Sequence, residues 1–548
     1  MARRRTLHGV PTDLATIARD VGALLLIEAA LMAVSTGVAA AFREWYVALG
    51  FLLSAGVTAA VGYAARRAFA EAPDPLMKHG MIIAAAGWFT VACFGALPLL
   101  LSATLTPPAV QAAYVPAGAD YGASSLRYFA DPLHALFESM SGWTGSGLTM
   151  AVHEPSLPRA VQWWRSLIQW VGGVGVVVLT VSILARPGSG SYALYRSEAR
   201  EEKIHPSIVS TVRTIWKVFL LYTVLAVVAT IAAIRLSAYG SQLSTFEVVW
   251  QGLNHAMTGL ATGGFSVTDG SIGTYNSPLV EGVLLPVMTL GAIAFPVHYA
   301  VLRERDPREL VADLQTRLLF GLFGVGVAAL AVQNLVALPA ADFGRQVSVP
   351  AWTTLSAARV DAVRDATFQF VSALTCTGFQ SSPIGAWSAG AKLLLSGAMV
   401  LGGAAGSTVG GIKLIRGYTA FRGIRFQFTR VFLPQNAIVT GRIGDRRLSR
   451  AQMEREFAEA AIVSLLWLLL LAVSSLVLVN AVGSGFTYAD ALFEVASAQG
   501  NVGLSTGITG PSMAPVAEAM FVLNMWVGRL EIIPVLVFGR ALLYGLEP

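Results

Sequence analysis

The sequence predicts an all-α membrane protein with about ten transmembrane helices, arranged as an N-terminal helix pair followed by four similar units around one axis. Three observations predict this fold class. Of the 548 residues, 55% are hydrophobic and 13% are charged, and the mean hydropathy is +0.62, whereas soluble domains carry about 25% charged residues. Apolar runs of spanning length recur along the whole chain, and an uncharged glycine-rich segment occurs four times between them.

The apolar runs define the predicted spans. A helix crosses the hydrocarbon core of a bilayer with about 20 residues. Runs of this kind lie near 21–42, 46–65, 80–103, 161–185, 212–234, 279–302, 318–338, 387–403, 459–481 and 518–543. The first run follows a basic start, but it is long and lacks a clear cleavage site, so we interpret it as a span and not as a signal peptide.

The basic residues indicate the topology. They cluster at the N-terminus, at Arg66-Arg67 and in 186–213, 303–317 and 413–455, whereas the alternate connections carry few. Because basic loops stay in the cytoplasm, both termini are expected there, which agrees with an even number of spans. The pI near 9.4 reflects this topology, and we expect no nucleic-acid partner. Cys93 and Cys376 lie in or beside apolar segments and indicate no disulfide framework or metal motif.

The glycine-rich segment repeats in register. It reads WTGSGLT, LATGGFS, LTCTGFQ and QGNVGLS around Gly147, Gly264, Gly378 and Gly503, at intervals of 117, 114 and 125 residues. Six residues before each glycine stands a small hydroxyl residue, and one after it a large apolar residue. Nine before it stands a polar residue, which is Glu138, His255, Gln369 or Glu494. We expect these four to support the loops by hydrogen bonds or, alternatively, to face an outer vestibule.

Each copy follows a short amphipathic stretch, such as 132–138 or 488–494, of about three helical turns. The repeating unit is therefore a span, a half-helix, a glycine loop and a second span. The predicted organisation is an N-terminal helix hairpin and four repeats, at 1–75, 76–190, 191–305, 306–430 and 431–548. A loop at membrane depth has to be shielded by protein or line a cavity that contains water, and four units around an axis satisfy both requirements.

The composition of the loops indicates cation binding by the main chain. A half-helix that ends inside the membrane points its partially negative end inward. A loop after it can turn carbonyl oxygens to the axis and replace the hydration shell of a cation, and glycine permits the backbone conformations this needs. The loops contain no Asp or Glu, which suits a monovalent cation. The alternative is that the small residues only mediate close helix contacts.

The chain resembles the TrkH branch of the Trk/Ktr/HKT superfamily of potassium transporters over nearly its whole length. The resemblance is carried by WWRSLIQWVGGVGVVVL (163–179), GAIAFPVHY (291–299), LGGAAGSTVGGIKLIR (401–416), RVFLPQNA (430–437), QGNVGLSTGIT (499–509) and GRLE (528–531). It implies a channel-like potassium uptake protein of the bacterial inner membrane, a homodimer that docks on a cytosolic, TrkA-type nucleotide-binding subunit. No covalent cofactor is implied.

The resemblance also implies the site residues. Potassium would be bound by the backbone carbonyls of Gly145, Ser146, Gly147, Thr262, Gly263, Gly264, Cys376, Thr377, Gly378, Asn501, Val502 and Gly503. The first filter loop departs from the family's threonine-rich run, and Cys376 and Asn501 stand where Thr is common. In plant relatives a Ser at the first filter glycine goes with sodium transport, so Gly147 favours potassium.

A gate is expected in the third unit. Glycines are concentrated in the middle of its second helix, and at about 1 kcal/mol per Gly relative to Ala they predict a break; a closely packed glycine-rich helix is the alternative. The resemblance implies that this loop gates conduction and that Arg529 lines the pore. The predicted gating residues are Gly402, Gly403, Gly406, Gly410, Gly411, Lys413 and Arg529. Arg529 lies deep in the last span, where a charge indicates function, although an ion pair with Glu531 is the other interpretation.

Other functions are less well supported. The run Gly406–Lys413 is a near miss for a phosphate-binding loop, and the glycines at 172–175 lie in an apolar span, so we expect no nucleotide site in this chain. An enzyme would need a motif such as HExxH or GxSxG in the spans, and the sequence has neither. Alternating access by inverted repeats is disfavoured because each repeat adds two crossings and keeps one orientation. A sodium-permeable, or Na⁺- or H⁺-coupled, potassium transporter remains the nearest alternative.

Overall fold

The computed structural model describes residues 6–7, 10–184, 208–337, 357–432, 440–443 and 446–546. The predicted boundary at 190/191, most of the basic stretch 186–213 and residues 433–437 of the RVFLPQNA motif lie outside the described residues. The described chain is helical apart from two antiparallel hairpins. These are β1 (Thr6–Leu7) with β2 (Val10–Pro11), and β3 (Thr440–Ile443) with β4 (Arg446–Ser449). The prediction of an all-helical fold is confirmed.

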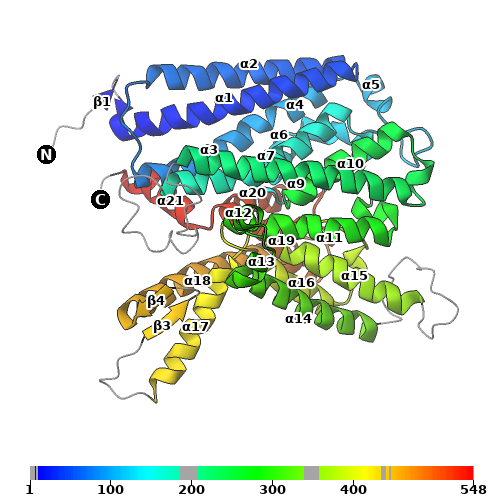
Figure 1. Ribbon diagram of the computed structural model, residues 1–548. Coiled ribbons are helices and arrows are strands. Elements are labelled where there is room, and N and C mark those ends of the chain that lie inside the picture. Colours follow the sequence, from blue (N-terminus) through cyan, green and yellow to red (C-terminus); the bar gives the residue numbers. More distant parts are fainter. Residues whose placement is uncertain are drawn as a thin grey trace.

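The N-terminal helix pair packs on one side of the molecule (Figure 1). It consists of α1 (Thr12–Ala41) and α2 (Trp45–Ala68). Gly22 and Gly62 let these helices approach closely, because a Cβ atom at either position would lie 2.8 Å from the carbonyl oxygen of the other. The chain then forms α3 (Met77–Gly95) and α4 (Leu97–Leu105), which together make one apolar span of 29 residues.

Six helical segments of the described residues are long and apolar enough to cross a membrane, and two bent helix pairs raise the number to eight. The six are Thr12–Ala41, Trp45–Ala68, Met77–Leu105, Val209–Leu236, Leu314–Ala337 and Arg450–Ala481. The last three correspond to α9 (Ile208–Leu236), α14 (Leu314–Ala337) and α18 (Arg450–Ala481). The chain is therefore a multi-pass membrane protein.

Two of the predicted spans are not continuous helices. The run 279–302 forms α11 (Pro278–Ala292) and α12 (Phe295–Glu304), which meet at 105°, and the run 518–543 forms α20 (Pro515–Arg529) and α21 (Ile533–Tyr544), which meet at 114°. Each second helix has a proline in its first turn, and proline cannot supply the amide hydrogen that would continue the preceding helix. At the second bend Glu531 and Ile532 also have positive φ.

Four shorter helices occupy the half-helix positions. They are α6 (Pro132–Thr144), α10 (Thr245–Leu260), α15 (Ala357–Leu374) and α19 (Tyr488–Gly500), with 13, 16, 18 and 13 residues. α10 and α15 are longer than the predicted three turns. Side chains before three of them cap the first turn: Asp131 accepts from Leu133 N–H, Ser244 from Glu247 N–H and Thr487 from Asp490 N–H. Such caps fix where a helix begins.

The remaining elements connect or extend these units. They are α5 (Pro108–Ala112), α7 (Arg159–Leu184), α13 (Arg308–Ala312), α16 (Ala389–Val400) and α17 (Leu414–Arg430), with 3₁₀ turns η1 (Ser125–Ala130), η2 (Glu154–Ser156), η4 (Gly240–Gln242), η5 (Ser271–Tyr275) and η6 (Ile384–Ala386). α17, β3, β4 and the start of α18 extend away from the helical body, and β1 and α21 lie toward one end of the molecule (Figure 1).

Candidate functional site

The four half-helices end in the same backbone conformation. We call the segments that follow them loop 1 (145–148), loop 2 (262–265), loop 3 (376–379) and loop 4 (501–504). In each loop the first and third residues have positive φ. The first residues are Gly145 (69°), Thr262 (52°), Cys376 (49°) and Asn501 (55°), and the third are Gly147 (75°), Gly264 (74°), Gly378 (81°) and Gly503 (106°). Residues with side chains rarely adopt this conformation, and it costs about 1–3 kcal/mol where they do.

One hydrogen-bond pattern accompanies this conformation in all four loops. The N–H of the second loop residue donates to the carbonyl of the hydroxyl residue five positions earlier. The four bonds are Ser146 to Ser141 (2.8 Å), Gly263 to Thr258 (2.8 Å), Thr377 to Ser372 (2.9 Å) and Val502 to Ser497 (2.9 Å). A left-handed residue followed by such a bond ends a helix abruptly and turns the chain. The predicted repeat is therefore a repeat of backbone geometry as well as of sequence.

The four loops meet in a closed ring. A Cβ atom added to Gly147 would lie 2.3 Å from the carbonyl oxygen of Gly263 in loop 2. The same position on Gly264 lies 2.0 Å from the Thr377 oxygen, that on Gly378 1.9 Å from the Val502 oxygen, and that on Gly503 2.6 Å from the Ser146 oxygen. Each glycine thus faces the carbonyl of the residue that precedes the glycine of the next loop, and the fourth loop contacts the first.

The twelve predicted filter residues all lie in these loops, and the ring brings them together. Their side chains tie the loops in place. Asn501 donates from Nδ2 to Ser146 Oγ (2.7 Å) and to the Met525 carbonyl (2.9 Å), which joins loop 4 to loop 1. The Thr262 hydroxyl contacts the Thr408 hydroxyl at 2.9 Å. Cys376 is buried and free of disulfide bonding.

The four polar residues nine positions before the glycines are fully buried, at 0% exposure. Each hydrogen-bonds to the chain just after its own loop. Glu138 accepts from Thr149 and Met150, His255 contacts Ser266, Gln369 donates to Ser381, and Glu494 accepts from Ser505, Thr506 and Thr509. Of the two roles considered for these residues, the structure supports the first: they hold the loops and do not face an outer vestibule.

Arg165 on α7 supports the loops, a role that was not identified from the sequence. Its Nε lies 2.6 Å from Glu138 Oε1, and both side chains are buried, at 1% and 0% exposure. The guanidinium also donates to the Ser266 carbonyl at 2.9 Å and covers the Phe265 ring at 4.2 Å. Arg165 therefore joins the half-helix of the first unit to loop 2. The only signal in the sequence was a lone arginine in an apolar run.

The helix that follows loop 3 is broken, as predicted. α16 ends at Val400, α17 begins at Leu414, and residues 401–413 form an irregular segment, which we call the 401–413 loop. Gly406 and Gly411 have φ of 79° and 69°. A Cβ atom at Gly402 would lie 1.9 Å from the Gly410 carbonyl oxygen, so the two ends of the loop touch. The glycines permit a folded loop here, and the alternative of a closely packed continuous helix is wrong.

The 401–413 loop lies against the bend of α11 and against two glycine loops. Thr408 N–H donates to the Gly291 carbonyl (3.1 Å) and Ala404 N–H to the Ala292 carbonyl (3.0 Å). The Thr408 hydroxyl reaches Thr262 of loop 2. A Cβ atom on Gly410 would lie 2.7 Å from Asn501 Oδ1 of loop 4. The loop is therefore in direct contact with the ring.

Arg529 ends α20 beside the ring and is buried, at 3% exposure. Its guanidinium donates to the carbonyls of Thr408 (2.5 Å), Gly172 (3.0 Å) and Gly173 (3.3 Å). A Cβ atom on Gly145 would lie 3.7 Å from its Nη1. Arg529 thus connects α7 and the 401–413 loop through main-chain oxygens, and it places a positive charge beside loop 1.

Glu531 forms ion pairs with two basic side chains other than Arg529. Its carboxylate lies 3.5 Å from Lys413 Nζ and 3.1 Å from Arg416 Nη1. Lys413 also donates to the Val409 carbonyl. The predicted gating residue Lys413 therefore closes the end of the 401–413 loop and ties it to the bend between α20 and α21. Among the described residues Arg529 donates to main-chain carbonyls, and Glu531 pairs with Lys413 and Arg416, so the contacts do not support the expected alternative of an Arg529–Glu531 pair.

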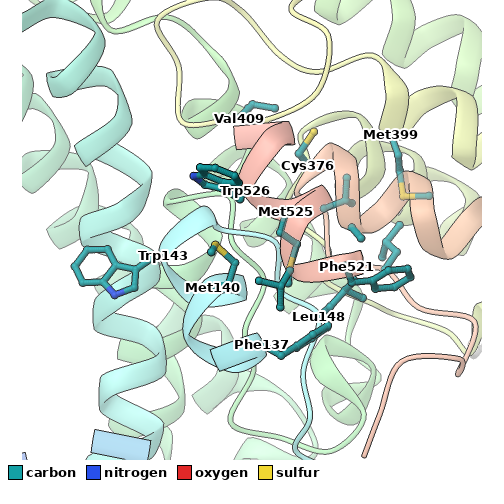
Figure 2. Packing of buried hydrophobic residues seen from close by; sticks show 14 of the residues in the cluster. Phe137, Met140, Trp143, Leu148, Cys376, Met399, Val409, Phe521, Met525 and Trp526 are labelled. Atoms are coloured by element: carbon teal, nitrogen blue, oxygen red, sulfur yellow. The ribbon is translucent and has the colours of Figure 1, made fainter. Parts of the chain in front are cut away.

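Apolar side chains pack around the ring. Figure 2 shows Phe137 and Met140 of α6 on the side of α6 toward Phe521 and Met525 of α20, with Leu148 of loop 1 near Phe521, whereas Trp143 of α6 points away from them. All belong to one buried cluster. Interiors packed in this way deform little, so the loops are held in a stiff frame. Among the described residues, no group of three His, Cys, Asp or Glu side chains could hold a metal ion.

The fold and the site define a multi-pass membrane protein with four half-helices that end at a ring of backbone turns, an arrangement suited to an ion-transport protein. A family model described as "TrkH: Cation transport protein" matches residues 79–543. An uncharacterized cation transporter of Methanocaldococcus jannaschii is 30% identical over 497 residues, covering 90% of this chain and 89% of that one. The chain belongs to the TrkH family of cation transport proteins.

A further relative supports this assignment, and a solved structure shares the fold. The Trk system potassium uptake protein TrkH of Salmonella typhimurium is 30% identical over 410 residues, which cover 74% of this chain and 77% of that protein. The crystal structure of the potassium transporter TrkH from Vibrio parahaemolyticus matches with a TM-score of 0.74 at 24% identity, covering 96% of this chain and 98% of that chain. This last likeness concerns the fold.

Proposed function

We propose that this chain is the ion-translocating subunit of a potassium uptake system, with a selectivity filter built from main-chain carbonyls. The observation that carries the proposal is the closed ring, in which the carbonyls of Ser146, Gly263, Thr377 and Val502 each lie against the glycine of the neighbouring loop. Carbonyl oxygens in such a ring can replace the hydration shell of a monovalent cation. Potassium is the ion named for several relatives.

The energetics of uptake fit a channel-like mechanism. A membrane potential of about 100 mV supplies about 2.3 kcal/mol per elementary charge, so a cation can enter without chemical coupling. The half-helices α6, α10, α15 and α19 direct their partially negative ends at the ring. These dipoles offset part of the loss of hydration, and the absence of a carboxylate from the twelve loop residues leaves the ion free to depart.

The same proposal assigns the inner elements to gating. The 401–413 loop and Arg529 contact loops 1, 2 and 4, and the proposal assigns them to the cytoplasmic side of the ring. A movement of this loop would open or close the exit, and the Arg529 charge would slow passage of a cation. We further propose that the chain is a homodimer in the bacterial inner membrane with both termini in the cytoplasm, regulated by a cytosolic nucleotide-binding subunit. The predicted repeat boundaries belong to this proposal.

Transport by purified protein in liposomes tests the proposal. A potassium gradient should drive uptake of potassium into protein-containing vesicles and not into empty ones, and sodium under the same gradient should enter more slowly. Equal rates for both ions would replace the potassium-selective reading with the sodium-permeable one. Uptake that needs an added proton or sodium gradient would indicate coupled transport and contradict the channel-like mechanism.

A further inference from the structure

The ring is symmetric in its backbone but not in the side chains that hold it, and the largest departure is at loop 2. Gln169 of α7 is fully buried, at 0% exposure, and its amide spans Gly264. Its Nε2 donates to the Gly263 carbonyl at 2.6 Å, and its Oε1 accepts from the Phe265 N–H at 2.9 Å. The amide can satisfy both bonds in only one orientation, because a flip would place like groups together.

The second observation is the residue before the filter glycine. Loop 2 has Gly263 there, whereas the other loops have Ser146, Thr377 and Val502. A Cβ atom on Gly263 would lie 2.5 Å from Gln169 Cδ and 2.6 Å from its Oε1. Real Cβ atoms essentially never approach so closely, so the amide occupies the space that a side chain fills in the other three loops. Gln169 and Gly263 are therefore matched to each other.

The corresponding helix positions in other units are apolar. Gly172, Gly291 and Gly528 are equivalent, because each packs on the carbonyl four residues before the filter glycine of its own unit. Three residues before them stand Gln169, Met288 and Met525. The second and fourth units thus carry methionine where the first carries glutamine, and a methionine side chain cannot hold a peptide by two hydrogen bonds.

We propose that Gln169 is a specificity-determining residue, which positions the Gly263 carbonyl in the ring and so sets the preference of the filter among alkali cations. This inference rests on the proposed function. The bond from Gln169 uses one lone pair of the Gly263 oxygen and leaves the other for an ion. It fixes the direction of that carbonyl and weakens its field relative to the other three, and the number and field strength of the carbonyl dipoles decide between potassium and sodium.

The test compares two glutamines on the same helix. Gln169→Met removes both bonds to loop 2 and introduces the residue found in the second and fourth units. Gln162→Met is the matched control, because Gln162 is equally buried but bonds to the Glu154 and Leu157 carbonyls and to Trp250. Each variant is reconstituted in liposomes as the full chain, and the ratio of potassium to sodium permeability is measured beside the potassium flux and the melting temperature.

We expect the permeability ratio of Gln169→Met to change by about three- to tenfold, the effect of losing the one neutral hydrogen bond that reaches the Gly263 carbonyl, while Gln162→Met keeps the wild-type ratio. If Gln169→Met is poorly folded, Gln169→Met/Gly263→Ser refills the space with the pair found at Met525 and Ser146, and the same change in ratio is expected. An unchanged ratio in a variant that still transports potassium overturns the inference alone. Wild-type vesicles without potassium uptake overturn the proposed function, and the inference with it.

Discussion

The four glycine loops with the segments that support them, which we call the outer part, and the helices that follow the loops, which we call the inner part, differ in how closely they repeat. In the outer part, four loops share the same pair of positive φ angles, the same hydrogen bond and the same contact with the next loop. In the inner part, the helices after the loops take different courses. α7 is continuous over 26 residues, α11 and α20 end in bends of 105° and 114°, and α16 ends after 12 residues in the 401–413 loop.

The difference follows from what each part has to do under the proposed function. An ion held by main-chain oxygens requires equivalent oxygens around it, so the outer geometry tolerates little variation. The inner part has no such requirement, and a gate needs only one unit to move. The side chains that hold the symmetric ring, such as Arg165, Gln169 and Asn501, nevertheless differ from unit to unit. The backbone is repeated, and its support is not.

The largest expected effect tests the uniformity of the ring. Gly147, Gly264, Gly378 and Gly503 are each changed to Ala, which places a Cβ atom 1.9–2.6 Å from a carbonyl oxygen at positive φ. Strain and overpacking together should reduce potassium flux by about a hundredfold or more in every one of the four variants. Flux assays in liposomes measure this.

The control for this series is Gly282→Ala. Gly282 lies in α11, and a Cβ atom there would meet no atom within 4 Å. The Gly282→Ala variant should transport potassium at the wild-type rate, and its free energy of unfolding should rise by up to about 1 kcal/mol, because Ala is the better helix former. A normal flux in any one of the four ring variants would break the comparison, since that loop would then not be equivalent to the other three.

The next effect concerns the supports of the loops. Glu138→Gln leaves Arg165 buried without its carboxylate partner, and removing one member of a buried ion pair costs about 3–5 kcal/mol. Glu494→Gln is the matched variant at the same position of the fourth unit, where the carboxylate accepts hydrogen bonds from hydroxyl and amide groups of Ser505, Thr506 and Thr509. Unfolding by denaturant in detergent compares the free energies of the two.

We expect Glu138→Gln to lose more stability than Glu494→Gln, and Glu138→Gln/Arg165→Met to recover part of the loss because no unpaired charge remains. Equal losses in the two single variants would mean that the ion pair contributes no more than the hydrogen bonds of the fourth unit. The support of the ring would then be as uniform as its backbone, contrary to our comparison.

A smaller effect depends on pH. Glu154 lies in the loop after loop 1, and burial raises its pKa from 4.5 to about 8, although the charge of Arg165 offsets part of the shift. The folded protein therefore holds this proton more tightly than the unfolded chain. Below pH 4.5 both states are protonated and the contribution is complete; it is lost as the pH rises through about 8.

The stability of the wild type should fall by about 4 kcal/mol between pH 5 and pH 8.5, because about three pH units separate pH 5 from the folded pKa and each is worth about 1.4 kcal/mol. Glu154→Gln imitates the protonated acid and should remove this part of the pH dependence. Denaturant midpoints of both proteins at the two pH values measure the difference. Parallel pH curves would show that Glu154 is not protonated in the folded state, and the outer part would then owe none of its stability to that proton.

The sequence predicted the symmetric part better than the asymmetric part. The four glycines could be found because the residues nine before, six before and one after them repeat in register. The break after α16 could be predicted because Gly402, Gly403, Gly406, Gly410 and Gly411 crowd a short stretch. The bends after α11 and α20 were missed because the apolar runs continue across them, although Pro296 and Pro534 stand at both.

The supports of the ring could not be assigned from sequence, for a physical reason. Arg165 and Gln169 are polar residues on a largely apolar helix, and their partners Ser266, just after loop 2, and Gly263, in loop 2, lie 101 and 94 residues away. A helical pattern indicates which face carries a side chain, but only the packing of one unit on the next decides what it contacts. The same holds for Glu138 and Glu494, whose two possible roles were separated by their burial.

The smallest of these effects concerns the inner part and a single charge. Arg529 bonds to the carbonyls of Thr408, Gly172 and Gly173. At about 7 Å and an effective dielectric constant of about 20, its repulsion of a potassium ion is about 2.4 kcal/mol. Arg529→Ala should therefore raise potassium flux by somewhat less than about a hundredfold.

Arg529→Lys separates the contribution of the charge from that of the hydrogen bonds, because it keeps the charge but loses the forked bonds that hold Thr408. Flux near the wild-type value in the lysine variant and high flux in the alanine variant would identify the charge as the barrier. High flux in both would identify the tether of the 401–413 loop, and wild-type flux in a well-expressed alanine variant would remove Arg529 from the gate and leave the asymmetry of the inner part without its proposed function.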